Sequence, residues 1–185
     1  MIGLVLDTSS EKPVIGLLKG KDRDTFIGDK PKHNASLLPS IDALLEKNNL
    51  QIKDIEYFGA VIGPGSFTGI RVGVASINAF CFALGKKAVA ITAFELAKYG
   101  VSGDILSLVD ARHNNYYTAL YANNTIKYAF LSIAEIESMP YKTVVRKATD
   151  PNVLLDIFIS KIKQGELTAP LRPFYLKPSS AEVGL

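Results

Sequence analysis

Residues 63–73 read GPGSFTGIRVG and are the most unusual segment of this chain. Within residues 63–69, three glycines and a proline lie between an apolar run, Tyr57–Ile62, and a long apolar segment that ends at Gly85. This pattern predicts a buried strand, a tight turn and a helix from about Thr68 to Leu84. Glycine permits close backbone approach and a helix N-terminus favours anions, so the turn either packs closely or binds a phosphate. Its spacing matches neither Walker A nor GxGxxG, which favours close packing.

The helix predicted after this turn is apolar nearly all round. One seam at 4-3-4-3 spacing comprises Ile70, Val74, Ile77, Cys81 and Leu84. One sheet can cover that seam, but a chain of this size has little else to cover the other side. We therefore expect another protein subunit there, and complete burial within the chain is the alternative.

Apolar runs on both sides of this unit predict further strands and helices. The expected strands, besides Tyr57–Ile62, are Ile2–Leu6, Val14–Leu18, Asp24–Ile27, Lys87–Ile91, Ile105–Val109, Tyr116–Tyr121 and Thr143–Arg146. A helix is expected from a cap near Asn34 or Ser36 to Asn48-Asn49, with Pro39 in or near its first turn. Further helices are expected at Ala93–Tyr99, after the capping box Ser132–Glu135, and from Asp150-Pro151 onward. The proline-containing tail after Gly165 is expected to be extended or partly disordered.

The pattern of the first predicted strand and the turn after it is repeated in the second half of the sequence. The runs from Ile2 to Asp7 and from Ile105 to Asp110 have the same length, and each ends in an acid followed by a polar turn and a second strand. Leu17 and Leu120 lie equally far beyond the two acids, so the register needs no gap. This repeat has two explanations, a duplicated unit or two unrelated hairpins.

Composition excludes several classes of protein. The 185 residues fit one domain or two small lobes, with 48% hydrophobic residues and a net charge of +3. A single cysteine excludes an internal disulfide, and two histidines exclude a three-His metal centre. No run of five basic residues indicates a nucleic-acid or membrane patch, and the apolar stretch Gly73–Gly85 is too short to span a bilayer. Without a signal-peptide pattern, we expect a cytoplasmic protein that does not enter a membrane.

Few residues are candidates for chemistry. Asp7, Thr8 and Ser9, together with Gly63 and Gly65 of the glycine turn, are candidate phosphate contacts, and a capped hairpin turn is the alternative. Asp110-Ala111-Arg112 is the matching element of the second half, where Arg112 pairs with an anion or with Asp104 or Asp110.

Metal ligands and nucleophiles are not suggested by the sequence. Leu37 stands four residues after His33, so no HxxxH pair is present. His113 falls in a polar turn, and Cys81 belongs to the apolar seam rather than to a reactive site. We therefore expect no catalytic residue and no metal site.

Several of these residues together resemble the TsaB (YeaZ) family. The resemblance lies in Leu4–Ser9, His33–Pro39, Gly63–Gly73, Asp110-Ala111-Arg112 and Pro173–Lys177 with Ala181-Glu182. It covers nearly the whole chain in order, and the glycine turn is its most specific part.

The resemblance implies an α/β fold of the actin-like ATPase type (ASKHA, ribonuclease H-like), with two duplicated lobes and mixed sheets. Residues 1–100 would form the first lobe, and residues 101–185 a shortened second lobe with an extended C-terminal tail. It implies a non-catalytic scaffold in making N6-threonylcarbamoyladenosine at position 37 of ANN-reading tRNAs. The catalytic relative TsaD carries the HxxxH metal pair, which Leu37 breaks here.

The family further implies the partners. These are a TsaD-like catalytic subunit, a TsaE-like ATPase, and a second copy when the chain is alone, with tRNA met only through the complex. No resident cofactor is implied, and ATP or ADP, where present, belongs at the partner interface. The interface maps to residues 34–47 and 68–84, and we expect it at Leu38, Ile41, Leu45, Ile70, Arg71, Gly73, Val74, Ile77 and Cys81.

The chain departs from the family in two places, and one other function is open. The second lobe is short, and Arg112-His113 stands where relatives often have two arginines. The alternative function is a small ATPase or phosphotransferase of the same fold, using Asp7, Thr8, Ser9 and Asp110.

Overall fold

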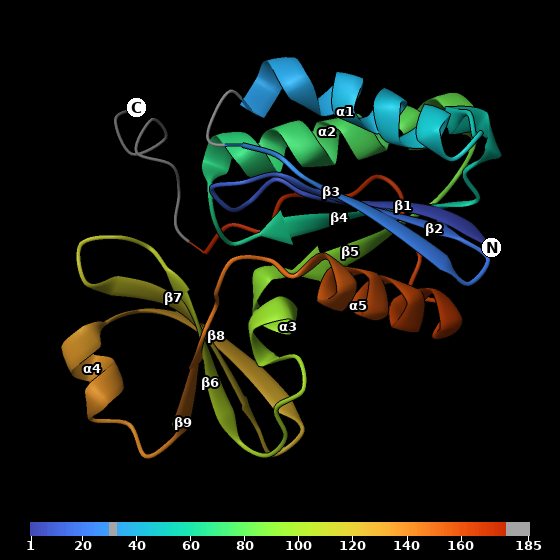
Figure 1. Ribbon diagram of the computed structural model, residues 1–185. Helices are drawn as coiled ribbons and strands as arrows, with labels where there is room; N and C mark the ends of the chain where they lie inside the picture. The colour runs from blue at the N-terminus through green and yellow to red at the C-terminus, as the bar shows by residue number, and fades with distance from the viewer. Residues whose placement is uncertain (30–32, 177–185) are drawn as a thin grey trace.

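The computed structural model describes residues 1–29 and 33–176, without the side chains of residues 33–35. Two mixed sheets carry the fold (Figure 1). The first has the order β3-β2-β1-β4-β5, formed by β1 (Ile2–Asp7), β2 (Val14–Lys19), β3 (Asp22–Ile27), β4 (Tyr57–Gly63) and β5 (Ala88–Thr92). The second has the order β8-β7-β6-β9, formed by β6 (Ile105–Asp110), β7 (Asn115–Ala122), β8 (Thr125–Ser132) and β9 (Lys142–Val145).

Helices cover both faces of the first sheet (Figure 1). The helices of the described residues are α1 (His33–Lys47), α2 (Phe67–Leu84), α3 (Ala93–Lys98), α4 (Ile133–Glu137) and α5 (Pro151–Lys163), with a short 3-10 turn at Ile52–Asp54. Helices α1 and α2 lie on one face of the first sheet and α5 lies on the other, whereas α4 packs on the second sheet. Successive side chains of β1 point to opposite faces of the sheet, as in any β-strand. Leu4 and Leu6 pack toward α1 and α2, whereas Val5 packs toward α5. The first sheet therefore forms the middle of three layers.

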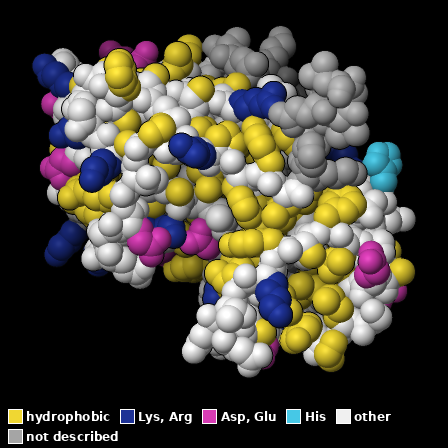
Figure 2. Space-filling model, turned by 180° about the vertical axis from the view of Figure 1, so that it is seen from behind, with side chains coloured by type: hydrophobic (Ala, Val, Ile, Leu, Met, Phe, Trp, Pro, Cys, Tyr) yellow, Lys and Arg dark blue, Asp and Glu magenta, His cyan; other side chains and the backbone are white. Residues whose placement is uncertain are grey.

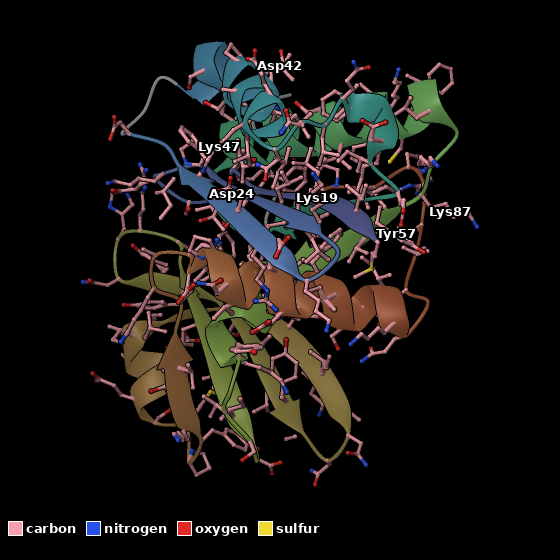
Figure 3. All side chains as sticks on the ribbon, turned by 45° about the vertical axis from the view of Figure 1, so that its right-hand side comes forward. Lys19, Asp24, Asp42, Lys47, Tyr57 and Lys87 are labelled. Atoms are coloured by element: carbon pink, nitrogen blue, oxygen red, sulfur yellow. The ribbon has the colours of Figure 1, made fainter. Side chains whose placement is uncertain are left out.

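Helix α1 begins earlier than its sequence indicates. It starts at His33, so the expected caps at Asn34 and Ser36 lie inside the helix, and Pro39 is its seventh residue rather than part of the first turn. The predicted end is confirmed, because the helix stops at Lys47 and Asn49 has a positive φ of 53°. Lys47 reaches Asp24 of β3 at 2.8 Å, which ties the end of α1 to the sheet (Figure 3).

Helix α2 follows the prediction closely. Ser66 caps its start by accepting a bond from the Gly69 N–H, and Gly85 ends it in the left-handed conformation that glycine favours. By length and composition alone, α2 is apolar enough to cross a bilayer. In this fold its inner side packs on β4 and β1 as part of the core.

The two sheets share one plan. In each, the first strand pairs antiparallel with the second and parallel with the fourth. The expected duplication is confirmed, but the ungapped register is wrong by one residue. Asp7 pairs with Val14, seven residues on, whereas Asp110 pairs with Tyr116, six residues on. The second turn is thus shorter, and the counterpart of Leu17 is Ala119, not Leu120.

Strand β8 is an element that the sequence reading missed. It pairs with β7 along its whole length, after a turn in which Asn123 and Asn124 have φ of 51° and 56°. Two asparagines with positive φ are typical of a two-residue hairpin turn, so the signal for β8 was present. The expected strand Thr143–Arg146 is displaced by one residue, because β9 ends at Val145.

The C-terminal part of the chain returns to the first sheet. Helix α5 packs on β2, β5 and β1, with Phe158 fully buried. Thr168 forms a bridge with Ala88 of β5, and Leu171 is buried in the core of the first sheet. The expected extended tail is therefore ordered and packed as far as residue 176. The division of the chain at residue 100 stays a prediction.

Candidate functional site

The glycine turn packs against the hairpin turn that follows β1. A Cβ on Gly65 would stand 2.5 Å from the Ser9 carbonyl oxygen, and one on Gly69 would overlap the Thr8 carbonyl oxygen. Thr8 Oγ1 donates to the Gly69 carbonyl at 2.6 Å and fills the place that a Cβ on Gly73 would need. Close packing, rather than ligand contact, therefore accounts for these glycines.

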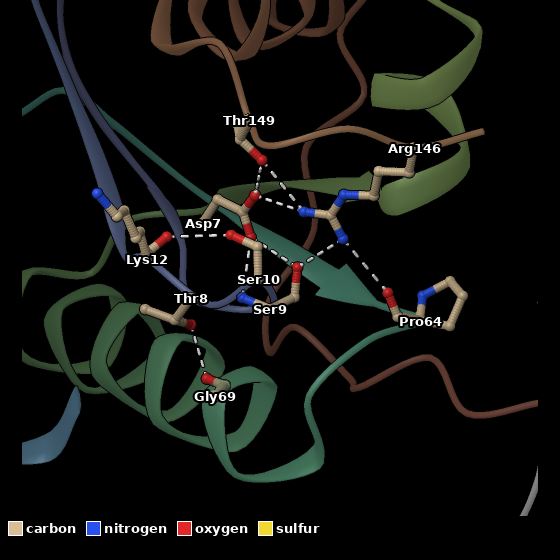
Figure 4. Close-up of polar contacts among 9 residues, drawn as sticks. All are labelled: Asp7, Thr8, Ser9, Ser10, Lys12, Pro64, Gly69, Arg146 and Thr149. Atoms are coloured by element: carbon tan, nitrogen blue, oxygen red, sulfur yellow. Dashed lines mark hydrogen bonds and ion pairs between the residues drawn. The ribbon is translucent and has the colours of Figure 1, made fainter. Parts of the chain in front are cut away.

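Asp7 lies at the centre of this junction and is fully buried (Figure 4). One carboxylate oxygen accepts bonds from the Ser9 N–H at 2.9 Å and from Ser9 Oγ at 2.6 Å. The other accepts from Thr149 Oγ1 at 2.5 Å and pairs with Arg146 Nη2 at 2.6 Å. Both oxygens of the carboxylate are thus already bonded within the chain.

Arg146 reaches Asp7 from the second sheet. Its side chain is 6% exposed, and its Nη1 also donates to Ser9 Oγ at 3.0 Å, with the Pro64 carbonyl oxygen at 3.5 Å. Burial pushes the pKa of Asp7 up, but the Arg146 charge and the hydrogen bonds from Ser9 and Thr149 outweigh it, and the pKa lies below its usual value. Asp7 is therefore a buried, ionised carboxylate whose charge is balanced by that of Arg146.

The expected phosphate contacts are brought together, but their groups are occupied. Asp7 pairs with Arg146, Ser9 bonds to both, and Thr8 donates to Gly69. A Cβ on Gly63 would stand 2.7 Å from the Phe174 carbonyl oxygen, so the returning tail covers that glycine. A capped turn, the alternative to a phosphate site, describes this arrangement.

Sequence reasoning missed Arg146 and Thr149. The sequence predicts Arg146 as the last residue of a strand, and Thr149 stands directly before Asp150, where a helix is predicted to begin. Neither position carries a local signal, because the contacts with Asp7 span 139 and 142 residues. The one signal that could have pointed to Arg146 is that it is an arginine without an expected partner, just beyond the end of a predicted strand.

The matching element of the second sheet is open to solvent. Asp110 is exposed and accepts a bond from the Arg112 N–H at 2.7 Å. Arg112, His113 and Asn114 all have positive φ, at 68°, 53° and 57°, in an exposed turn. Within the described residues the Arg112 guanidinium forms no ion pair with Asp104 or Asp110. The expected turn position of His113 is therefore observed.

Most of the residues expected at a partner interface are buried inside this chain. The buried ones are Ile41, Leu45, Ile70, Gly73, Val74, Ile77 and Cys81. Their side chains face the first sheet and the neighbouring helix, so a docked partner would not touch them. Leu38, 50% exposed, and Arg71 lie on the outside. The seam was correctly identified as apolar, but it is the inner side of α2.

The outer side of α2 carries a different set of residues. Phe82 is 93% exposed, the highest value among the large apolar side chains described. The exposed positions at 3–4 residue spacing are Arg71, Ala75, Ala79 and Phe82. We refer to this stripe of α2 as the outer helix face.

Other candidate groups serve the structure. Burial raises the pKa of the Cys81 thiol to about 11, in agreement with a core role. Within residues 1–29 and 33–176, no three His, Cys, Asp or Glu side chains are grouped to hold a metal ion. The side chain of His33 lies outside the described part.

A concave region of about 800 Å³ lies between α3 and α5 and is open to solvent. Two groups of paired charges line it. Lys161 bonds to Glu95 at 2.7 Å and to Glu166 at 2.5 Å, while Asp156 accepts from Tyr99 at 2.7 Å. These charges are paired, and Lys98, which also lines the region, has its Nζ over the Tyr121 ring at 4.6 Å from the ring centroid.

Comparisons with known proteins agree on the family. Residues 29–171 match the model of the family described as "TsaD: tRNA N6-adenosine threonylcarbamoyltransferase". An uncharacterized protein of Mycobacterium tuberculosis is 25% identical over 197 residues, which cover 97% of this chain and 93% of that protein. The tRNA threonylcarbamoyladenosine biosynthesis protein TsaB of Bacillus subtilis is 32% identical over 126 residues, covering 64% of this chain and 54% of that one.

The solved structure of YeaZ from Pseudomonas aeruginosa has a TM-score of 0.75 with this chain at 22% identity. The match covers 95% of this chain and 99% of that one. A likeness at this identity shows the fold. The expected α/β fold of the actin-like type, with two mixed sheets, is thereby confirmed.

Proposed function

Since this chain belongs to the TsaB (YeaZ) family and matches the TsaD-type family model over most of its length, we propose that it acts in threonylcarbamoyladenosine synthesis. The modified nucleoside is made at position 37 of ANN-reading tRNAs. In this synthesis the chain is a non-catalytic subunit that binds and supports a TsaD-like catalytic subunit. The complex works in the cytoplasm with a TsaE-like ATPase, and tRNA meets this chain only through the complex.

The outer helix face carries this proposal. Phe82 is almost fully exposed at the end of a helix whose inner side is core. Ala75 and Ala79 precede it on the same side, and such small residues let another helix approach closely. An exposed aromatic beside small residues is typical of an interface anchor. The partner therefore docks through this face rather than through the buried seam.

The occupied state of Asp7 supports the non-catalytic role. An ATPase or phosphotransferase at this place needs free hydroxyls and a carboxylate to meet phosphate or a metal. Here Asp7 is neutralised by Arg146, and the Thr8 and Ser9 hydroxyls already have partners. The alternative enzyme function therefore has the weaker support.

Co-purification with the TsaD-like subunit tests the proposal. Phe82→Asp removes an exposed anchor without touching the core, so the variant should fold and lose most of the association. Ile126→Asp is the matched control, because Ile126 is a 48% exposed apolar residue on β8 of the other sheet. It should retain the partner.

Two outcomes would contradict this assignment. Full association of Phe82→Asp would show that the partner binds elsewhere. ATP hydrolysis by the chain alone that disappears in Asp7→Ala would favour the enzyme alternative.

A further inference from the structure

Strand β8 forms an edge of the second sheet and differs from the other edge strands of the described chain. The edge at β5 is bridged by Thr168, and β3 carries the charged residues Asp22, Arg23 and Asp24. Strand β9 has only four residues. Strand β8 has eight residues in unbroken register, without proline, and Lys127 is its one charged residue. Coverage, charge and short length are the usual devices that keep an edge from pairing, so β8 is the least protected of these edges.

The free side of β8 carries the backbone groups of Ile126 and Tyr128. Directly after the strand, the Ile133 N–H donates to the Asn114 carbonyl and so continues the ladder with β7. Residues that bond to the same neighbouring strand alternate along an antiparallel pair, so the odd-numbered residues of β8 bond to β7. Ile126 and Tyr128 therefore point their N–H and C=O groups away from β7. No backbone hydrogen bond from elsewhere in the described chain reaches these groups, which leaves them available to another strand.

The side chains of Ile126 and Tyr128 are also apolar and exposed, in one row with Phe130. The Tyr128 ring stacks on Phe94, and the Phe130 ring packs on Tyr117, each with 5.7 Å between ring centroids. These contacts hold the row in place before any partner binds. Figure 2 shows apolar side chains gathered between the two sheets and down over the second one. The free side of β8 thus combines unpaired backbone groups with an apolar surface.

A second copy of this chain fits the free side of β8, because the strand is complementary to itself in one register. Antiparallel pairing about Tyr128 places Tyr128 opposite the Tyr128 of the second copy, and Ile126 opposite its Phe130. Aromatic–aromatic and aromatic–β-branched pairs of this kind stabilise neighbouring strands. The same register places Lys127 opposite Ala129 of the second copy, whereas a register centred on Lys127 would oppose the two lysines. The single charge of β8 therefore selects the register about Tyr128.

We propose that this chain forms a two-fold dimer by antiparallel pairing of β8 with β8 of a second copy. The two four-stranded sheets then become one sheet of eight strands. A two-fold contact uses the same surface on both copies and closes on itself, so no further copy is added. Figure 1 shows α2 above the first sheet and β8 below it. The outer helix face therefore stays accessible to a TsaD-like subunit, and the dimer does not depend on that partner.

Sedimentation velocity over a range of concentrations tests the dimer. Every chain carries Phe82→Asp, which removes any pairing through the outer helix face. This parent should show a reversible monomer–dimer equilibrium. Ile126→Pro removes one outward N–H, a change that an edge strand accepts where the N–H faces solvent, so the variant should fold and stay monomeric. Ile126→Val keeps the N–H and is the matched control, which should dimerise like the parent.

Charges at residue 129 test the register. Ala129→Glu places a carboxylate opposite Lys127 twice in each dimer and should tighten dimerisation by about two- to thirtyfold, whereas Ala129→Lys should weaken it by a similar factor. Lys127→Glu combined with Ala129→Lys restores opposite charges and should recover tight dimerisation.

Two results would overturn the proposal. One is a parent that is monomeric at every concentration, as expected if β8 instead receives a strand of another protein. The other is a dimer whose affinity is the same in the Ile126 and Ala129 variants. If Ile126→Pro does not fold, the Ala129 variants decide the matter. Neither result bears on the proposed function, because association with the TsaD-like subunit is measured separately through Phe82.

Discussion

Replacing Gly73 by alanine tests whether the glycines of residues 63–73 exist for close packing. In a helix interior the change alone should stabilise the protein by about 1 kcal/mol, because alanine is the better helix former. Here the new Cβ would overlap Thr8 Oγ1, which donates to the Gly69 carbonyl. The side chain of Thr8 must therefore move, and its hydrogen bond is lost.

The expected magnitude follows from three terms. Overpacking costs about 1–3 kcal/mol, and the lost hydrogen bond about 1 kcal/mol, against the gain of about 1 kcal/mol in helix propensity. Gly73→Ala should thus destabilise the protein by about 1–3 kcal/mol. In the double variant with Thr8→Ala the overlap is gone, because Thr8 Cβ lies 3.4 Å away, at ordinary contact. Thr8→Ala alone also loses the hydrogen bond, at about 1 kcal/mol, whereas the double variant should have nearly the stability of the parent, so the two changes should couple favourably by about 2–4 kcal/mol.

Urea denaturation of the four proteins in this cycle measures the coupling. Gly69→Ala provides the control, because its Cβ meets the Thr8 carbonyl oxygen, which Thr8→Ala leaves in place. That second cycle should be close to additive. A stabilising Gly73→Ala, or equal rescue of both glycine variants by Thr8→Ala, would refute the packing argument.

Two further predictions concern titratable groups. The folded pKa of Asp7 lies below its unfolded value near 4, so its contribution to stability is present above about pH 4 and is lost as the pH falls through the folded pKa. Asp7→Asn should therefore flatten the fall of unfolding free energy between pH 5 and pH 2, and an identical acid limb would speak against the pair. For Cys81, a pKa of about 11 leaves roughly a hundredfold less thiolate near neutral pH than the usual 9.0. Iodoacetamide should label the native chain far more slowly than the urea-unfolded chain, and equal rates would show that the thiol is not in the core.

Much of the secondary structure is readable from the sequence because its signals are local. Short continuous apolar runs predicted β1, β2 and β6, and the glycine turn and Gly85 marked the two ends of α2. Strand β8 was missed although its signals are also local. Ile126, Tyr128 and Phe130 alternate with Lys127 and Ala129, and two asparagines precede the run.

The features of the candidate site likewise fall into those that the sequence predicts and those that only the tertiary structure decides. The sequence by itself determined the family, the glycine turn and the repeated strand–acid–turn unit, since each depends on residues close together in the chain. Tertiary structure alone decided which side of α2 faces outward, because the sheet and α1 bury the seam and leave Phe82 in solvent. It alone placed Arg146 on Asp7, because two charges 139 residues apart meet only when both sheets have formed and their common interior excludes water.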